Sequence, residues 1–91
     1  MLEKDIEKYF CNLVSAKGGK AIKGAGTGVA GFPDRIVLKP GGKVFFVELK
    51  APGQKPRKLQ VHVIGWLIDM GFSVYVIDSK EKACEVIYNE F

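Results

Sequence analysis

The sequence has few of the residues that a zinc-binding or disulfide-rich protein needs, and it lacks the long apolar runs of a membrane protein. Its 91 residues include one histidine, His62, and two cysteines, Cys11 and Cys84. A zinc site needs more ligands than these, and a disulfide framework needs more cysteines. We therefore interpret both cysteines as core thiols. No run of about 18 apolar residues occurs, which excludes a membrane-spanning helix. The N-terminus lacks the apolar stretch of a signal peptide, and we therefore expect a cytoplasmic protein.

What remains is the composition of one small globular domain, which we expect to span residues 1–91. Hydrophobic residues make up 47% of the chain, a fraction typical of folded rather than disordered proteins. A chain this short buries only about two-thirds of the surface that it exposes when unfolded, so its core is thin. Self-association would bury more apolar surface, and we therefore expect a homodimer.

Acidic residues are scarce in the middle of the chain. The formal net charge of the whole chain is +4, but residues 17–58 carry ten basic residues and only two acidic ones, Asp34 and Glu48. Such a basic block indicates a phosphate-binding surface, although a solvated lysine-rich face has the same composition. Carboxylates inside a polyanion-binding surface repel the ligand unless a cation lies between them. The two isolated carboxylates are therefore the first indication of a metal ion.

Apolar spacing and turn residues predict seven elements in the order α-β-β-β-α-β-α. We expect Pro56 at the first position of the middle helix and Asp78 as the N-cap of the last one. The glycine-rich loop at residues 24–31 lacks the ending of a nucleotide-binding loop, and we interpret it as a flexible connection. A right-handed crossover between strands 43–50 and 72–77 predicts a parallel pair, and so a mixed sheet flanked by helices. The remaining elements are expected at residues 3–16, 20–23 and 35–39.

The predicted hairpin brings the two isolated carboxylates together. If residues 40–42 form a three-residue loop, Lys39 pairs with Lys43 and Asp34 lies opposite Glu48. Directly opposed residues have Cβ atoms about 5 Å apart, a distance at which two carboxylates destabilise each other without a cation. Side chains alternate along a strand, so Lys50 lies on the same face as Glu48. The alternative interpretation is an aspartate that ends a turn beside a surface Glu–Lys pair.

A carboxylate pair with a neighbouring lysine is what hydrolysis of a phosphodiester requires. A divalent ion on the carboxylates activates water and polarises the phosphoryl oxygen. A lysine beside it can orient or deprotonate the nucleophile and offset the charge of the transition state. Together with the basic block, the motif favours this chemistry over a solvated surface pair.

The residues Gly31-Phe32-Pro33-Asp34, then Val47-Glu48-Leu49-Lys50, then Gln60 resemble the virus-type replication-repair nuclease (VRR-NUC) domain of the PD-(D/E)XK superfamily. The resemblance implies a restriction-endonuclease-like α/β fold and a metal-dependent DNA nuclease that leaves 5′-phosphates. It also implies that Asp34, Glu48 and the carbonyl of Leu49 bind Mg²⁺ or Mn²⁺, while Lys50 and Gln60 complete the catalytic set. The family has a further acidic residue on the first helix, for which we choose Glu7 over Glu3 as a metal-binding residue.

Basic residues around this motif are candidates for binding DNA phosphates. Phosphate contacts give salt-dependent binding with little sequence preference, and no element resembles a base-reading helix. The candidates are Lys23, Arg35, Lys55, Arg57 and Lys58.

Stand-alone members of the family resemble dimeric Holliday-junction resolvases, which implies a homodimer acting on branched DNA in repair. The family resemblance also implies a phage source, with action in the bacterial host cell. Two other functions stay open: a non-catalytic or partner-dependent DNA-binding module, and a monomeric flap or single-strand nuclease.

Overall fold

The helices and strands follow one another in the predicted order. The computed structural model describes every residue from Met1 to Phe91. The mixed α/β fold and the order α-β-β-β-α-β-α are confirmed, with one short 3₁₀ helix, η1, added after the first strand. No helix is both long enough and apolar enough to cross a membrane. The elements are α1 Glu3–Ala16, β1 Lys20–Lys23, η1 Gly24–Thr27, β2 Arg35–Lys39, β3 Lys43–Leu49, α2 Lys58–Asp69, β4 Val74–Ile77 and α3 Lys80–Glu90.

The four strands form one mixed sheet in the order β1-β2-β3-β4. Strands β1, β2 and β3 pair antiparallel, and β4 pairs parallel to β3, as the crossover through α2 predicts. Lys39 lies opposite Lys43, which confirms the three-residue hairpin loop. The register of the β2–β3 pair therefore agrees with the one from which Asp34 and Glu48 were expected to face each other.

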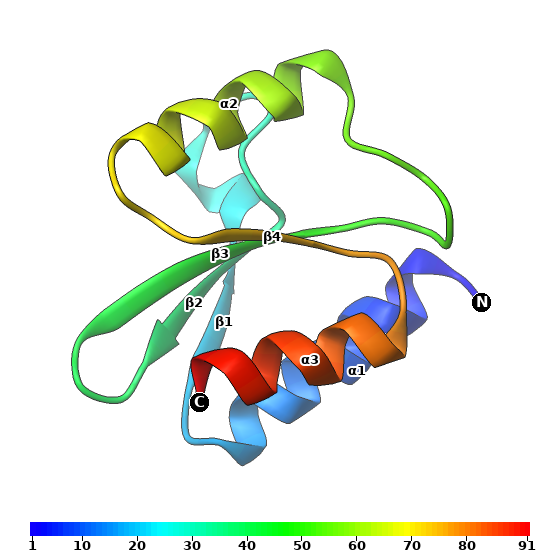
Figure 1. Ribbon diagram of the computed structural model, residues 1–91, viewed down its shortest axis with the longest axis vertical. Helices are drawn as coiled ribbons and strands as arrows, with labels where there is room; N and C mark the ends of the chain where they lie inside the picture. The colour runs from blue at the N-terminus through cyan, green and yellow to red at the C-terminus, as the bar shows by residue number, and fades with distance from the viewer.

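The sheet lies between two helical layers. Helices α1 and α3 lie side by side on one face, and α2 covers the other (Figure 1). On the first face, Ile6, Phe10 and Val14 recur at helical spacing on α1 and are completely buried. On the second face, Val63 and Leu67 of α2 pack with β3 in a smaller cluster. The layers thus follow directly from the apolar stripes of the helices.

Strand β3 runs through the middle of the molecule, and its residues from Phe45 to Leu49 are all buried. Phe45 and Val47 belong to the core beneath α1 and α3, whereas Phe46 belongs to the cluster beneath α2. Because side chains alternate along a strand, Glu48 points to the α2 side. A central strand covered on both faces therefore carries a carboxylate into the interior.

Two expected helix starts are wrong. The second helix begins at Lys58 with Arg57 as its N-cap, so Pro56 precedes the helix and does not open it. The last helix is capped by Ser79, whose hydroxyl accepts a hydrogen bond from the backbone N–H of Lys82. Asp78 instead accepts a hydrogen bond from the N–H of Gly53, at 3.3 Å, and so ties the loop before α2 to the end of β4.

The glycine-rich connection after β1 passes very close to the segment that carries Asp34. Gly24 donates its N–H to the carbonyl of Asp34 at 2.8 Å. A side chain at Gly24 would place its Cβ 1.8 Å from the carbonyl oxygen of Pro33, so only glycine fits. The hydroxyl of Thr27 donates to the Gly24 carbonyl at 2.8 Å and closes the turn of η1. The first half of this connection is thus a defined turn beside the predicted site.

Candidate active site

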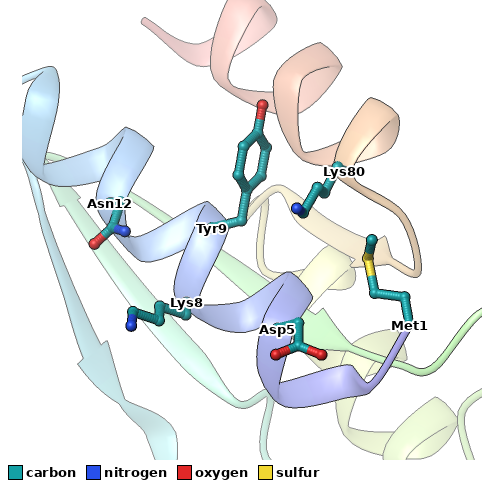
Figure 2. A pocket seen from close by; sticks show the side chains of 6 residues that line it. All are labelled: Met1, Asp5, Lys8, Tyr9, Asn12 and Lys80. Carbon is teal, nitrogen blue, oxygen red and sulfur yellow. The ribbon is translucent and has the colours of Figure 1, made fainter.

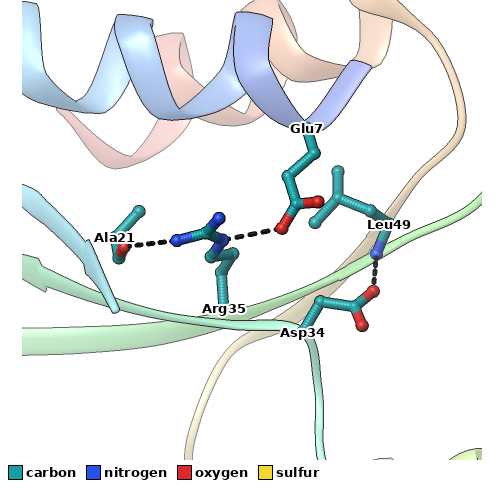
Figure 3. A network of polar contacts seen from close by, with 5 residues as sticks. All are labelled: Glu7, Ala21, Asp34, Arg35 and Leu49. Carbon is teal, nitrogen blue, oxygen red and sulfur yellow. Dashed lines mark hydrogen bonds and ion pairs between the residues drawn. The ribbon is translucent and has the colours of Figure 1, made fainter. Parts of the chain in front are cut away.

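Asp34 and Glu48 lie next to each other at the end of the sheet where β2 begins and β3 ends. Arg35 pairs with Val47, so continuing this register by one residue sets Asp34 opposite Glu48. One carboxylate oxygen of Asp34, Oδ2, accepts a hydrogen bond from the backbone N–H of Leu49 at 2.7 Å (Figure 3). The end of β3 therefore holds the Asp34 carboxylate in a fixed orientation.

The Glu48 carboxylate is buried without a hydrogen-bond partner. Its side chain is 1% exposed, and neither carboxylate oxygen makes a hydrogen bond within the chain. Burial first, and then the neighbouring Asp34 carboxylate, raise the pKa of Glu48 from 4.5 to about 7. A buried carboxylate without donors is costly to a folded protein unless another group neutralises it.

Lys50 supplies the one cation close to this carboxylate. Its Nζ lies 3.3 Å from Oε2 of Glu48, and the lysine side chain is largely buried. The backbone N–H of Lys50 donates to the carbonyl of Ile77 at 2.9 Å, which extends the β3–β4 pairing by one residue. This charge opposes the rise in the pKa of Glu48 without cancelling it. Carboxylate and amine are therefore held side by side by the sheet.

Gln60 reaches the site from the first turn of α2. It is buried, and its Oε1 accepts a hydrogen bond from the backbone N–H of Arg57 at 2.7 Å. This bond satisfies one of the free N–H groups at the helix start and fixes the plane of the amide. Because the oxygen is engaged, the Nε2 group is the part of Gln60 left to donate hydrogen bonds.

Two clefts flank Asp34, and both also contain Arg57 and Gln60. The first, of about 410 Å³, we call the Lys23 cleft. The second, of about 380 Å³, we call the Lys50 cleft. The Lys23 cleft is lined by Glu7, Lys23, Gly24, Ala25, Val29, Gly31, Phe32, Asp34, Arg57 and Gln60. The Lys50 cleft is lined by Glu3, Asp34, Leu49, Lys50, Gln54, Lys55, Arg57 and Gln60.

The structure brings most of the predicted basic residues to these clefts. Lys23 borders one of them, Lys55 borders the other, and Arg57 borders both. Lys58, the first residue of α2, is exposed but lines neither cleft. Arg35 also lines neither cleft, because its side chain is engaged elsewhere.

Arg35 forms an ion pair with Glu7 of α1. Its Nε donates to Oε2 of Glu7 at 2.8 Å, and its Nη1 donates to the carbonyl of Ala21 at 2.9 Å (Figure 3). Glu7 lines the Lys23 cleft and Glu3 lines the Lys50 cleft, so the two candidate acids of α1 border different clefts. The chain has no cluster of three or more Asp, Glu, His or Cys side chains spaced to hold a metal ion.

The residues at Asp34 fit a divalent cation. The two oxygens of Glu48, which accept no hydrogen bond and lie next to the second carboxylate, are hard ligands, and Lys50 alone does not balance the charge of the two carboxylates. A pair of carboxylates without a third acidic ligand is the donor set that Mg²⁺ commonly uses, because it keeps several of its waters. Asp34, Glu48 and the carbonyl of Leu49 are the groups that would hold such an ion.

A larger cavity, of about 550 Å³, is lined by residues of α1 from Asp5 to Asn12, by Met1 and by Lys80 at the start of α3 (Figure 2). Its wall includes Tyr9, which lies beneath the ammonium group of Lys80 and hydrogen-bonds Cys84 at 3.1 Å. Asp5 is the only carboxylate there. Each cleft is lined by two carboxylates, Asp34 with Glu7 or Glu3, and we therefore assign the candidate active site to the clefts.

Comparison with known proteins agrees with this geometry. A phage protein named "Putative nuclease p44", from Acyrthosiphon pisum secondary endosymbiont phage 1, is 43% identical over 79 residues, which cover 87% of this chain and 85% of the relative. A solved structure described as "VRR_NUC domain" superposes with a TM-score of 0.89 and 29% identity, covering 98% of this chain and 97% of that one. No family model matches the chain. The chain belongs to the VRR-NUC family.

Family membership confirms the resemblance that the Pro33-Asp34 and Glu48-Leu49-Lys50 motifs suggest, and with it the nuclease class. The two clefts and the buried Glu48 thus belong to a VRR-NUC nuclease fold. One signal was missed in the sequence. Alternation along β2 sets Arg35 on the face opposite Asp34, toward α1, where an acidic partner such as Glu7 was to be expected.

Proposed function

We propose that this VRR-NUC protein is a divalent-metal-dependent DNA endonuclease that acts on branched DNA as a single domain spanning residues 1–91. The observation that carries the proposal is Glu48, whose buried carboxylate has no hydrogen-bond partner and lies beside Asp34. A bound Mg²⁺ or Mn²⁺ ion would neutralise the buried charge of Glu48, which is otherwise costly to the folded protein. When bound, the ion would polarise the phosphodiester and make water more acidic.

The chain's own residues would complete the reaction around that ion. Asp34, held by the N–H of Leu49, and Glu48 would be the acidic ligands, with the Leu49 carbonyl beside them. Lys50 lines the Lys50 cleft with its ammonium beside Glu48, where it would orient the attacking water or offset charge on the phosphoryl group. Gln60 would donate from its free amide nitrogen to a phosphate oxygen.

The shape and charge of the clefts support a binding mode in which a DNA strand crosses the site from one cleft to the other. Asp34, Arg57 and Gln60 are common to both clefts, so a phosphate lying over them would have its neighbours above Lys23 on one side and Lys55 on the other. These contacts are to the backbone and carry no sequence information. Such contacts favour selection of DNA by its shape over selection by its sequence, and the family resemblance implies a 5′-phosphate at the cut.

A homodimer would suit a substrate with two equivalent strands, because two sites related by a twofold axis cut symmetrically. The surface of α2 supports self-association: Val61 and Ile68 lie on one flank of the helix and are more than half exposed. Packing these side chains against a second copy would remove apolar surface from water. The phage relative supports the cytoplasm of a bacterial host as the place of action.

The test is cleavage of labelled DNA by the purified chain. Four-way junction, flap, duplex and single-stranded substrates are each incubated with Mg²⁺, with Mn²⁺ and with EDTA. Lys50→Ala is the inactivating variant, and Lys43→Ala is the matched control, because Lys43 is the first residue of β3, Lys50 directly follows its end, and Lys43 lines neither cleft. We expect metal-dependent cutting that is lost in Lys50→Ala and kept in Lys43→Ala, while both variants still bind DNA.

The pattern of products separates the alternatives. Paired symmetric nicks in the junction, together with a dimer by size-exclusion chromatography with light scattering, support a junction resolvase. A monomer that prefers flaps or single strands replaces it with the second nuclease hypothesis. DNA binding without cleavage in either metal rejects the catalytic proposal in favour of a DNA-binding module.

A further inference from the structure

The side chain of Arg35 is fixed at two points. Its Nε donates to Glu7 and its Nη1 donates to the carbonyl of Ala21 on β1, and the side chain is 17% exposed. A guanidinium held at two positions in its plane has little freedom to turn toward another ligand. Arg35 therefore connects α1, β1 and β2 next to Asp34 while lining neither cleft.

Glu7 is held by only one of its carboxylate oxygens. Oε2 accepts from Arg35, whereas Oε1 makes no hydrogen bond within the chain. The residue lines the Lys23 cleft together with Asp34 and Gln60. An acceptor oxygen is thus left free on the wall of the cleft that borders the proposed ion.

We infer that Arg35 is a positioning residue for Glu7, and that it holds this carboxylate as an outer acceptor for a water of the bound ion. Two observations separate this role from direct ligation and from phosphate binding. Glu7 forms no acidic cluster with Asp34 and Glu48, and Nε and Nη1 of the guanidinium are engaged within the chain. Groups that orient the waters of a metal site affect metal affinity nearly as strongly as the ligands do.

The strand geometry gives this arrangement its physical basis. Arg35 lies opposite Val47, whose side chain belongs to the core beneath α1, so Arg35 projects to the α1 face of the sheet. Asp34, one residue earlier, projects to the α2 face. The consecutive residues Asp34 and Arg35 thus serve the site from opposite faces of the sheet, one as a ligand and one through Glu7.

The inference rests on the proposed function, and a charge-matched substitution tests it. Arg35→Lys keeps the positive charge but cannot donate to Glu7 and Ala21 through one rigid plane. The quantity to measure is the Mn²⁺ affinity of the chain without DNA, obtained from the rise of the unfolding temperature with MnCl₂ concentration. We expect Arg35→Lys to weaken Mn²⁺ binding about tenfold. In a Glu7→Gln background the same substitution should have no further effect, because the group that Arg35 positions is already gone.

A control on the same strand separates this effect from the general loss of an ion pair. Lys39→Gln removes the contact between Lys39 and Glu90, which spans 2.9 Å at the far end of β2 and is buried to a similar degree. That variant should bind Mn²⁺ like the unaltered chain. The double variant Glu7→Gln/Arg35→Gln keeps the net charge and should bind four-way-junction DNA in EDTA within about twofold of the unaltered chain.

Each contrary result has a distinct meaning. Unchanged Mn²⁺ affinity in Arg35→Lys overturns the inference while leaving the proposed function in place. Loss of DNA binding in the double variant as large as in Arg57→Gln makes Arg35 a phosphate contact and also overturns it. Failure of the unaltered chain to bind Mn²⁺ overturns the proposed function together with the inference.

Discussion

Glu48 should make the metal-free protein less stable than a neutral side chain of the same shape would at this position. Its pKa rises from 4.5 to about 7 on folding, so the folded chain binds this proton more tightly than the unfolded chain does. The stabilisation from the bound proton is complete below pH 4.5 and is lost as the pH rises through about 7. Glu48→Gln removes the charge while keeping the shape, so its effect should depend on pH in the same interval.

The expected magnitude follows from the size of the shift. A shift of this size corresponds to roughly 3 kcal/mol between the charged and neutral forms. Part of that is screened beside solvent-accessible clefts, and the new amide also lacks partners, so we expect a net gain of about 1–2 kcal/mol at pH 8. For a chain of this length, that raises the unfolding temperature by about 5–15 °C. At pH 4.5 the two proteins should differ little.

The assay is thermal or urea unfolding in EDTA at pH 4.5 and pH 8, repeated at pH 8 with millimolar Mn²⁺. Manganese should stabilise the unaltered chain and leave Glu48→Gln unchanged, because the variant lacks one of the two carboxylates. Glu85→Gln is the control, since Glu85 is exposed and paired only with Lys82 one turn away. Equal or lower stability of Glu48→Gln at pH 8 in EDTA would refute the reasoning that this buried charge is costly.

Two further predictions concern the rest of the site. Gly24→Ala should destabilise the fold by about 1–3 kcal/mol in thermal unfolding, because its Cβ would meet the Pro33 carbonyl. Gly26→Ala, where the Cβ would meet nothing, should be neutral, and equal stability of the two variants would contradict this account. Lys55→Gln and Arg57→Gln should each reduce the salt dependence of junction binding in EDTA by about one phosphate contact. An unchanged salt slope, measured by fluorescence anisotropy, would show that the clefts do not hold the DNA backbone.

Much of the fold could be predicted from the chain itself, because local signals were strong. The helical spacing of Ile6, Phe10 and Val14 predicted α1 with its bounds, and the Pro40–Gly42 turn predicted the register of the hairpin. The start of α3 was not predictable in the same way. Asp78 and Ser79 are both good N-cap residues, and a contact from Gly53, distant in the sequence, engages Asp78 and leaves the cap to Ser79.

For the site, alternation and hairpin length by themselves determined that Asp34 faces Glu48 with Lys50 beside it, because strand geometry fixes which residues oppose each other. Only the tertiary structure decided how these groups behave. Coverage of β3 on both faces buries Glu48 and raises its pKa, and the docking of α1 brings Glu7 to Arg35 instead of to the carboxylate pair. Burial and partner choice depend on helices that pack across the sheet from distant parts of the chain, and no local pattern contains that information.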